Sequence, residues 1–397
     1  MTKTRNRLIS VGIALLVLIA AAVFIIPTTT ASAAGEVWDG KAASSFAGGD
    51  GSETSPYQIA NGAQLAYLAQ QVNSGNITSG LYYELTADID LGGKEWTPIG
   101  NYPNTFKGKF SGKGYTISNL SINKPNDKDV GLFGYSIGEI SNLAANGTVT
   151  GKSNVGGICG RNGDKCEIHA CSFDGKVSGG MSYDCESVGG ICGLSAGAVY
   201  NCFNSAVVSG YSKVGGICGS NYLQVSDDVT VGRVSGTDTG SLGSICGFID
   251  DDGYNLLRCY YNTDICGDDI VPVGNQPDVA DYNWCKKTTE DLCSDLLTRG
   301  SNLLSERLWV AGSNTVTPDP KYAGNKFADR FGIRTKTYVG LKNVGTRMIV
   351  SETPSYNFKT TGTDNVWEAY TPITSTADYL TLTNDPAQWA DNFVLVA

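Results

Sequence analysis

Histidine can serve as a general acid, a general base or a metal ligand, and His169 is the one histidine among the 397 residues. A zinc peptidase of the H-E-x-x-H type needs a histidine pair, and a serine or cysteine triad needs a histidine beside its nucleophile. His169 lies between Ile168 and Ala170 in a repeated segment whose other copies carry Ser, Tyr or Leu. We therefore interpret it as a surface histidine, and the sequence predicts no catalytic residue and no enzyme activity.

Adjacent acids are the second source of chemistry. They occur as Asp227 with Asp228, as residues 250–252, and as Asp268 with Asp269. Their oxygens could bind calcium, or serve a hydrolase or lyase built on a β-helix as acid and base. Loop acids of an acidic chain are more often solvated, so no cofactor or metal site is predicted, with calcium as the weak alternative. Asp228 differs from the others because it occupies a repeat position where an apolar residue is expected.

Cysteine is the third possible source of chemistry, and the chain contains 12 cysteines, which is many for an exported protein. Seven of them recur at two repeat positions, which form one column of Cys159, Cys192, Cys218 and Cys246 and another of Cys171, Cys202 and Cys259. Stacked strands would place neighbours ~5 Å apart, within the disulfide range. Two interpretations stay open, namely reduced thiols packed as small apolar side chains and disulfides between successive rungs.

Two further cysteines lie outside these columns. Cys166 and Cys185 are in the two insertions that flank one repeat, so we predict a disulfide between them that staples those loops. The chain has no C-x-x-C pair, and this spacing argues against a metal site.

Internal repeats show which elements must position these side chains. The motif V-G-G-I-C-G occurs at 155–160, 188–193 and 214–219, and decays to L-G-S-I-C-G at 242–247. An aliphatic residue follows each copy, and a valine follows nine residues later in the pairs Ile140 and Val149, Ile168 and Val177, Val199 and Val208, and Val225 and Val234. Each repeat of about 25–33 residues thus offers three short strands joined by elastic, glycine-rich segments.

Such strands are too short to bury a core alone, but identical strands stacked coil upon coil do so. The sequence therefore predicts an all-β protein, a right-handed parallel β-helix. Its interior should contain one row of isoleucines, Ile158, Ile191, Ile217 and Ile245. Each buried isoleucine would contribute roughly 1.5–3 kcal/mol.

The remaining segments complete a predicted domain organisation. Residues 1–33 read as a signal peptide, with a basic start, an apolar run over 8–26 and cleavage between Ala33 and Ala34. An uncleaved membrane anchor is the alternative. Residues 34–135 form a cap and the first coils, with a helix over Leu65, Leu68 and Val72. Residues 136–287 form the repeats, 288–322 a helical cap running to about Trp309 and then a linker, and 323–397 a small β-rich region.

Charge excludes some partners. The net charge of −10 becomes −13 once Lys3, Arg5 and Arg7 are removed with the signal segment, which contains no acid. This balance argues against nucleic acid and against an anionic membrane surface, because both need a basic face. A membrane partner is expected only if the N-terminal segment stays uncleaved.

The motifs resemble the GLUG-motif repeats of bacterial surface proteins. The resemblance rests on the V-G-G-I-C-G copies, on G-L-F-G at 131–134, and on upstream segments at 88–91, 96–100, 106–112 and 117–120, and it covers roughly residues 36–322. It implies a secreted or cell-surface protein of adhesin-like character, and it carries no functional residue over to this chain.

Three functions remain open. We expect a monomeric, non-enzymatic protein that binds an extracellular glycan or protein. Tyrosines in the joints suit such contacts, although strand-flanking tyrosine is the commoner role; they are Tyr183, Tyr222, Tyr254, Tyr260 and Tyr261. The alternatives are a carbohydrate-active enzyme on the same scaffold and a structural stalk that presents the C-terminal region.

Overall fold

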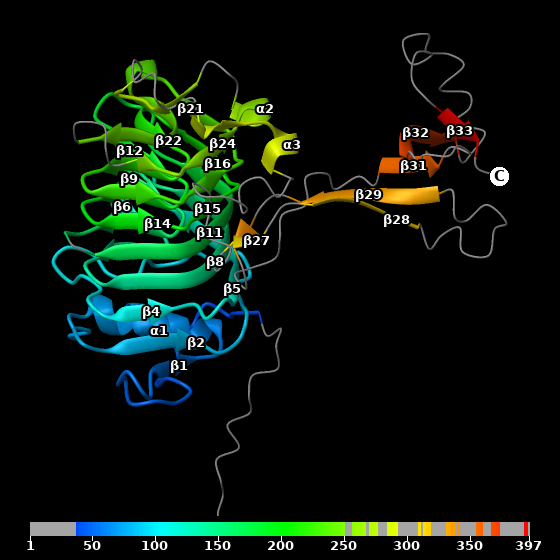
Figure 1. Ribbon diagram of the computed structural model, residues 1–397. Coiled ribbons are helices and arrows are strands. Elements are labelled where there is room, and N and C mark those ends of the chain that lie inside the picture. The colour runs from blue at the N-terminus through cyan, green and yellow to red at the C-terminus, as the bar shows by residue number, and fades with distance from the viewer. Residues whose placement is uncertain are drawn as a thin grey trace, which may run out of the picture. The chain divides into compact units, whose positions relative to one another are not determined.

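The computed structural model is a parallel β-solenoid of about 8 turns, so the predicted fold class is confirmed (Figure 1). It describes residues 37–292, except 165, 251–255, 267–269 and 277–283, and the backbone of seven strands between 309 and 395. The predicted signal peptide and its cleavage at Ala33 and Ala34 lie outside the described residues. No helix in the described part is long and apolar enough to cross a bilayer.

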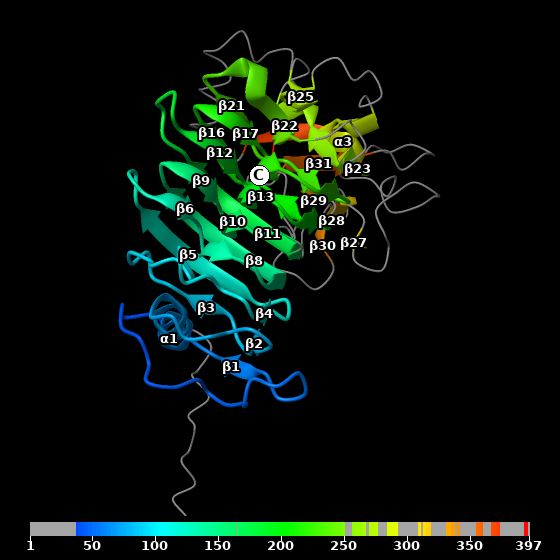
Figure 2. The same cartoon turned by 90° about the vertical axis from the view of Figure 1, so that its left-hand side faces the viewer.

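The N-terminal cap contains one helix among its strands. The elements are β1 (Tyr57–Ile59), α1 (Gly62–Asn73), β2 (Tyr82–Leu85), β3 (Ile89–Asp90), β4 (Lys109–Ser111), β5 (Thr116–Asn123), β6 (Lys128–Val130) and β7 (Phe133–Ser136). The side chain of Asn61 caps α1 by accepting a hydrogen bond from the Gln64 N–H at 3.0 Å. Leu65, Leu68 and Val72 are buried on one face, so the predicted helix is present at the N-terminal end of the stack (Figures 1 and 2).

The repeats form the coils above this cap. Their elements are β8 (Glu139–Thr150), β9 (Ser153–Gly156), β10 (Cys159–Asn162), β11 (Glu167–Ser178), β12 (Glu186–Gly189), β13 (Cys192–Ser195), β14 (Ala198–Tyr200), β15 (Phe203–Asn204), β16 (Val207–Gly210), β17 (Ser212–Gly215), β18 (Cys218–Asn221), β19 (Gln224–Ser226), β20 (Val229–Thr230), β21 (Val234–Gly236), η1 (Thr239–Ser241) and β22 (Leu242–Ile249). Pairing between these coils is parallel throughout. It gives one sheet of 16 strands, which includes cap strands and β23, β24 and β26, and one of 10 strands.

The three predicted rows of strands are in register. Val188 pairs with Val155 and Val214, Val199 with Ile168 and Val225, and Val208 with Val177 and Val234. The isoleucine row is also confirmed, since the amides of Ile158, Ile191 and Ile217 bond the isoleucine carbonyls of the next coil at 3.1, 3.0 and 2.8 Å. All four side chains of this row are fully buried. The repeat positions therefore define the hydrophobic interior.

Glycine is required in the motif because backbone approaches backbone there. A Cβ on Gly189 would lie 2.1 Å from the Cys192 carbonyl oxygen, and the equivalent glycines of the other coils would clash at 2.0–2.2 Å. A Cβ on Gly219 would lie 2.2 Å from the backbone nitrogen of Val188, which belongs to the preceding coil. These two glycines of each motif let the chain bend tightly and let neighbouring coils touch.

Left-handed residues other than glycine form the corners of each coil. The residue before each of the first three motifs has a left-handed backbone, in Asn154, Ser187 and Lys213, at φ between 52° and 66°. A second left-handed column falls at the joint after the aliphatic residue, in Asn142, Ala170, Asn201, Asp227 and Arg258, at φ between 49° and 59°. The same bend therefore recurs at the same position of successive coils, which keeps the strands stacked.

Beyond the repeats the structure departs in part from the prediction. The elements are β23 (Leu256–Leu257), β24 (Tyr260–Asn262), α2 (Thr263–Cys266), β25 (Val271–Val273), β26 (Lys286–Lys287) and α3 (Thr289–Leu292). Helix α3 starts where predicted, with the Asp291 carboxylate accepting from the Thr288 N–H at 3.0 Å. Residues 293–308 lie outside the described residues. The predicted linker contains strands β27 (Trp309–Val310) and β28 (Ser313–Pro318), because its alternating Thr and Val residues favour extended backbone.

The C-terminal region is β-rich, as predicted. Strands β28, β29 (Phe331–Thr337), β31 (Ser355–Lys359) and β32 (Trp367–Ile373) pair antiparallel in sequence, and β33 (Phe393–Leu395) joins β32 in parallel. A separate antiparallel pair joins β27 to β30 (Gly340–Leu341).

Candidate functional site

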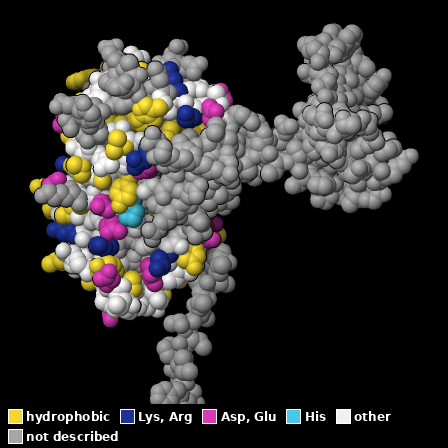
Figure 3. All heavy atoms as spheres, viewed as in Figure 1, with side chains coloured by type: hydrophobic (Ala, Val, Ile, Leu, Met, Phe, Trp, Pro, Cys, Tyr) yellow, Lys and Arg dark blue, Asp and Glu magenta, His cyan; other side chains and the backbone are white. Residues whose placement is uncertain are grey.

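His169 lies on the outside of β11 within a row of polar side chains from successive coils. Its Nε2 is 3.3 Å from Glu139 Oε1 on β8, and its ring stacks on Tyr200 of β14 with centroids 4.9 Å apart. Lys109 of β4 binds the other oxygen of Glu139 at 3.1 Å. Figure 3 shows the histidine in cyan among acidic and basic side chains. The structure thus places His169 on the surface, where it contacts Glu139 and Tyr200.

The acids of this row all have partners. The Tyr200 hydroxyl donates to Glu167 Oε2 at 2.7 Å. Partial burial of Glu139 raises its pKa, but hydrogen bonds from Lys109 and His169 outweigh this and lower the pKa overall. An acid held by a cation stays ionised and does not serve as a general acid near neutral pH. The row is therefore a hydrogen-bonded surface ladder in which Lys109 neutralises Glu139, and the aligned positions of Glu139 and Glu167 could have revealed it in the sequence.

Both cysteine columns lie in the solenoid interior. Cys192 pairs in register with Cys159 and Cys218, and Cys218 with Cys246. All seven column cysteines are fully buried, and the eleven described cysteines are free thiols in this structure. Burial raises the pKa of Cys246 to about 12 and the pKa values of Cys192, Cys202, Cys218 and Cys259 as well. Such thiols are poor nucleophiles, which favours their role as small packed side chains.

Cys166 and Cys185 are also free thiols, so the disulfide that we predicted between them is absent here. Cys166 lies just before β11, and Cys185 lies beyond the other end of that twelve-residue strand, just before β12. The prediction treated the two insertions as neighbours because they flank one coil. Strand β11 instead separates them, since it contributes two of the coil's three strand rows, at Ile168 and at Val177.

Asp228 is a fully buried carboxyl in the second cysteine column. Its Oδ1 accepts a hydrogen bond from the Cys202 N–H at 2.6 Å, and its Oδ2 lies 3.8 Å from Cys259 Sγ. Burial raises the pKa of Asp228 well above its usual value. A carboxyl in such surroundings favours its neutral form. Asp228 occupies the position that a cysteine takes in the coils on either side.

The other sequence candidates do not converge. Asp227 forms an ion pair with Arg258 of the next coil, with nitrogen–oxygen distances of 2.5 and 2.7 Å. Acids at 251, 252, 268 and 269 and Tyr254 lie outside the described residues. No three His, Cys, Asp or Glu side chains among the described residues could hold a metal ion.

The predicted tyrosines divide into two groups. Tyr183 and Tyr222 are 86% and 41% exposed. Tyr260 and Tyr261 are buried in β24, which corrects their prediction as surface residues, and the Tyr261 hydroxyl donates to the Ile270 carbonyl at 2.8 Å. Strand β24 lies between β20 and β26, and the Tyr260 ring packs edge-on against Trp284.

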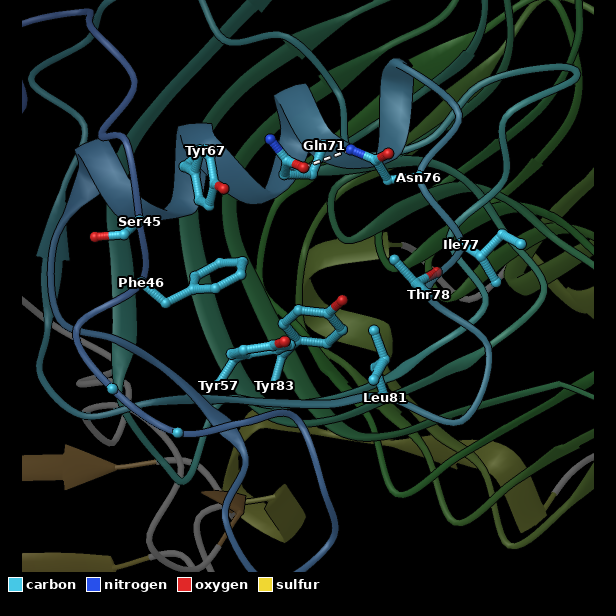
Figure 4. A pocket seen from close by; sticks show the side chains of 12 residues that line it. Ser45, Phe46, Tyr57, Tyr67, Gln71, Asn76, Ile77, Thr78, Leu81 and Tyr83 are labelled. Atoms are coloured by element: carbon cyan, nitrogen blue, oxygen red, sulfur yellow. Dashed lines mark hydrogen bonds between the residues drawn. The ribbon is translucent and has the colours of Figure 1, made fainter.

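An aromatic pocket in the N-terminal cap is the most site-like feature of the described residues. It has a volume of about 350 Å³ and lies between α1, the loop before β1, and the segment between α1 and β2. Figure 4 shows that its aromatic side chains point toward one another from separate elements, namely Phe46, Tyr57 of β1, Tyr67 of α1 and Tyr83 of β2. The Phe46 ring lies 4.7, 5.0 and 5.7 Å from the rings of Tyr57, Tyr67 and Tyr83.

Polar groups complete the pocket. The Asn76 amide donates to Gln71 Oε1 at its edge, and neither residue carries charge (Figure 4). Gly48 and Gly49 contribute bare backbone to one wall. A second cavity of about 380 Å³ is lined by Trp38, Trp96 and residues of α1, but both tryptophans are buried. Sequence reasoning missed the aromatic pocket because its residues come from separate segments without periodicity.

The fold defines this chain as a repeat protein of the parallel β-solenoid class. A family model described as the GLUG motif matches residues 151–178, which span the corner after β8, β9, β10 and β11, so the predicted resemblance is confirmed. Residues 151–178 of this chain therefore contain a GLUG motif.

Two curated proteins are similar to parts of the chain. A protein of Evansella cellulosilytica described as a Gly-rich membrane protein is 37% identical over 130 residues, which are 30% of this chain and 14% of the relative. Halomucin of Haloquadratum walsbyi is 32% identical over 172 residues, 40% of this chain and 2% of halomucin. The chain thus spans a small part of either relative's length. No solved structure matches it. The motif and these relatives fit a surface repeat protein.

Proposed function

We propose that this protein is exported and acts outside the cell as a non-enzymatic binding protein of adhesin-like character, whose ligand is an extracellular glycan or protein. One observation carries the proposal, the preformed aromatic pocket on the rigid cap. Small-molecule sites are typically concave and aromatic with a few polar groups. The signal-like N-terminus and the surface-type relatives support the extracellular location.

Catalysis of glycan cleavage is the weaker alternative. Glycosidases of the common type need two carboxylates with different protonation states. Glu139 and Glu167 pair in register, but Lys109 and His169 already bind both oxygens of Glu139, and the Tyr200 hydroxyl binds one oxygen of Glu167. Asp228 is enclosed in the interior, out of reach of a polysaccharide.

To test this proposal, the full chain and a variant without residues 1–33 are expressed in a bacterial host. We expect the full chain in the medium or on the cell surface, accessible to added protease, and the shortened chain inside. The exported protein should bind at least one class of polysaccharide, glycoprotein or whole cell in a broad panel without releasing soluble sugar. Retention of the full chain in the cytoplasm, or sugar release from the panel, would contradict the proposal.

The stalk alternative is tested on the same panel. A variant that ends at residue 322 should keep its binding if the solenoid and cap carry the ligand site. Complete loss of binding in this variant would instead assign the solenoid the role of a spacer for the C-terminal region.

A further inference from the structure

We propose that the aromatic pocket of the cap binds a single neutral sugar residue at the end of a glycan chain. This inference rests on the proposed extracellular binding function and names its ligand class and its site. The pocket volume of about 350 Å³ is at the small end of the usual range for ligand sites. This volume suits one ring and its immediate linkage, whereas a groove along the solenoid would suit an extended chain.

Aromatic rings account for the first half of the recognition. A pyranose has one apolar face of C–H groups and a rim of hydroxyls, so it binds where a ring face lies beside polar groups. Tyr57 and Tyr67 are both partly exposed, and each contacts Phe46 through its ring. Figure 4 shows Tyr67 projecting from α1 opposite Tyr57, so the two rings lie on opposite sides of the same pocket.

Unused hydrogen-bonding groups account for the second half. Within the described residues, the hydroxyls of Tyr57, Tyr67 and Tyr83 have no hydrogen-bond partner (Figure 4). Burial raises the pKa of Tyr83 above its usual value, so its hydroxyl keeps its proton and can donate. The Gln71 amide uses its oxygen for Asn76 and has its N–H groups left for a ligand. These groups match the alternating donors and acceptors of sugar hydroxyls.

Charge defines the sugar as neutral. None of the twelve residues that line the pocket is acidic or basic. A uronate or an amino sugar would bring a charge into a site without a counter-charge, at a desolvation cost that the site does not offset. A charged peptide terminus is disfavoured for the same reason, whereas a neutral hexose or its N-acetyl form loses no ionic hydration.

The experiment titrates the purified exported chain with methyl glycosides of glucose, galactose, mannose and N-acetylglucosamine, and with methyl glucuronide, by calorimetry and ligand-observed NMR. At least one neutral glycoside should bind, and the glucuronide should bind at least about tenfold more weakly. Equal or tighter binding of the glucuronide would overturn the assignment of neutrality.

Two variants locate the site. Tyr67→Ala removes a ring wall and should weaken binding by about tenfold or more. Gln71→Met keeps the side-chain volume but removes the amide, and should weaken binding without changing the far-UV circular dichroism. The matched control is Tyr102→Ala, which removes a tyrosine that is 82% exposed outside the pocket and should leave binding unchanged. Unchanged binding in both pocket variants would overturn the proposal.

A separate outcome distinguishes this inference from the proposed function. If no monosaccharide glycoside binds while the same preparation binds a polysaccharide, glycoprotein or cell surface, the pocket assignment fails and the binding function stands. If the broad panel also shows no ligand, the proposed function fails as well.

Discussion

A single carboxyl interrupts the apolar interior at Asp228. In the coils before and after it, the equivalent position is Cys202 or Cys259, which places a thiol where Asp228 brings two oxygens. The one strong hydrogen bond, from the Cys202 amide, satisfies one oxygen only. The interior therefore tolerates this residue in its neutral form, and ionisation within the fold costs free energy.

Replacement of this acid by its amide should stabilise the protein. Asp228→Asn keeps the acceptor for the Cys202 amide and removes the ionisable group, so we expect the free energy of unfolding at neutral pH to rise by roughly 1–3 kcal/mol. The measurement is urea denaturation followed by circular dichroism. Loss of stability in this variant at neutral pH but not at low pH would show that the carboxylate is ionised and bound in the native state.

The pH dependence follows from the direction of the pKa shift. Because the folded pKa of Asp228 is raised above its usual value of 3.8, the folded state binds more protons than the unfolded state above about pH 4. The free energy of unfolding should therefore fall as the pH rises from about 4 toward the folded pKa. Asp228→Asn should show a smaller fall than the wild type. The exposed Asp250→Asn is the control and should retain the wild-type slope.

At the scale of the element, the V-G-G-I-C-G motif is explained by steric contact. The valine and isoleucine fill the interior, and the first and third glycines lie where backbone atoms of the same or the preceding coil leave no room for a Cβ. The motif therefore forms a tight bend whose valine and isoleucine point into the core. The same residue types recur in each coil because the backbone geometry requires them, and no catalytic role is needed to explain them.

Gly189→Ala tests this explanation. The added methyl would meet the Cys192 carbonyl oxygen at 2.1 Å, so the bend must open, and we expect a loss of about 3 kcal/mol of stability or failure to fold. The matched control is Gly240→Ala on the exposed η1, where the nearest atom is Asp238 Oδ1 at 3.5 Å. The control should change the free energy of unfolding by less than about 0.5 kcal/mol. Similar effects of the two substitutions would refute the steric explanation.

Much of the solenoid could be predicted from sequence, because each coil repeats the same residue type at the same interior position. Ile158, Ile191 and their equivalents align by pattern alone, and parallel stacking then follows from burial. The pocket could not be predicted in this way, because Phe46, Tyr67 and Tyr83 occur once each and meet only after α1 packs on the first coil. Cys166 and Cys185 are free thiols in the structure, and their sequence spacing did not show that β11 lies between them.

At the scale of the whole molecule, each coil contacts only its neighbours, so its contribution should be nearly modular. Deletion of residues 188–213 joins Ser187 to Val214, which replaces Lys213 by another residue that already has a left-handed backbone. We expect a folded solenoid one coil shorter, with retained β-sheet circular dichroism, cooperative unfolding and a smaller denaturant m-value.

A deletion of half a coil provides the control. Removal of residues 188–200 joins Ser187 to Asn201, which puts the following strands out of their rows and turns interior side chains toward solvent. This shorter deletion should aggregate or unfold. If both deletions gave equally stable proteins, the fixed stacking of coils would not be what holds the structure together.

The segment 180–185 leaves the stack between β11 and β12, whose positions are fixed by β8 and β9 below and by β16 and β17 above. Tyr183 within it is 86% exposed. An epitope or peptide grafted there would emerge at a known height along the axis while the hydrophobic interior keeps its contacts. Because the coils stack at a regular spacing, insertions at equivalent joints would display foreign sequences at defined distances along the solenoid axis.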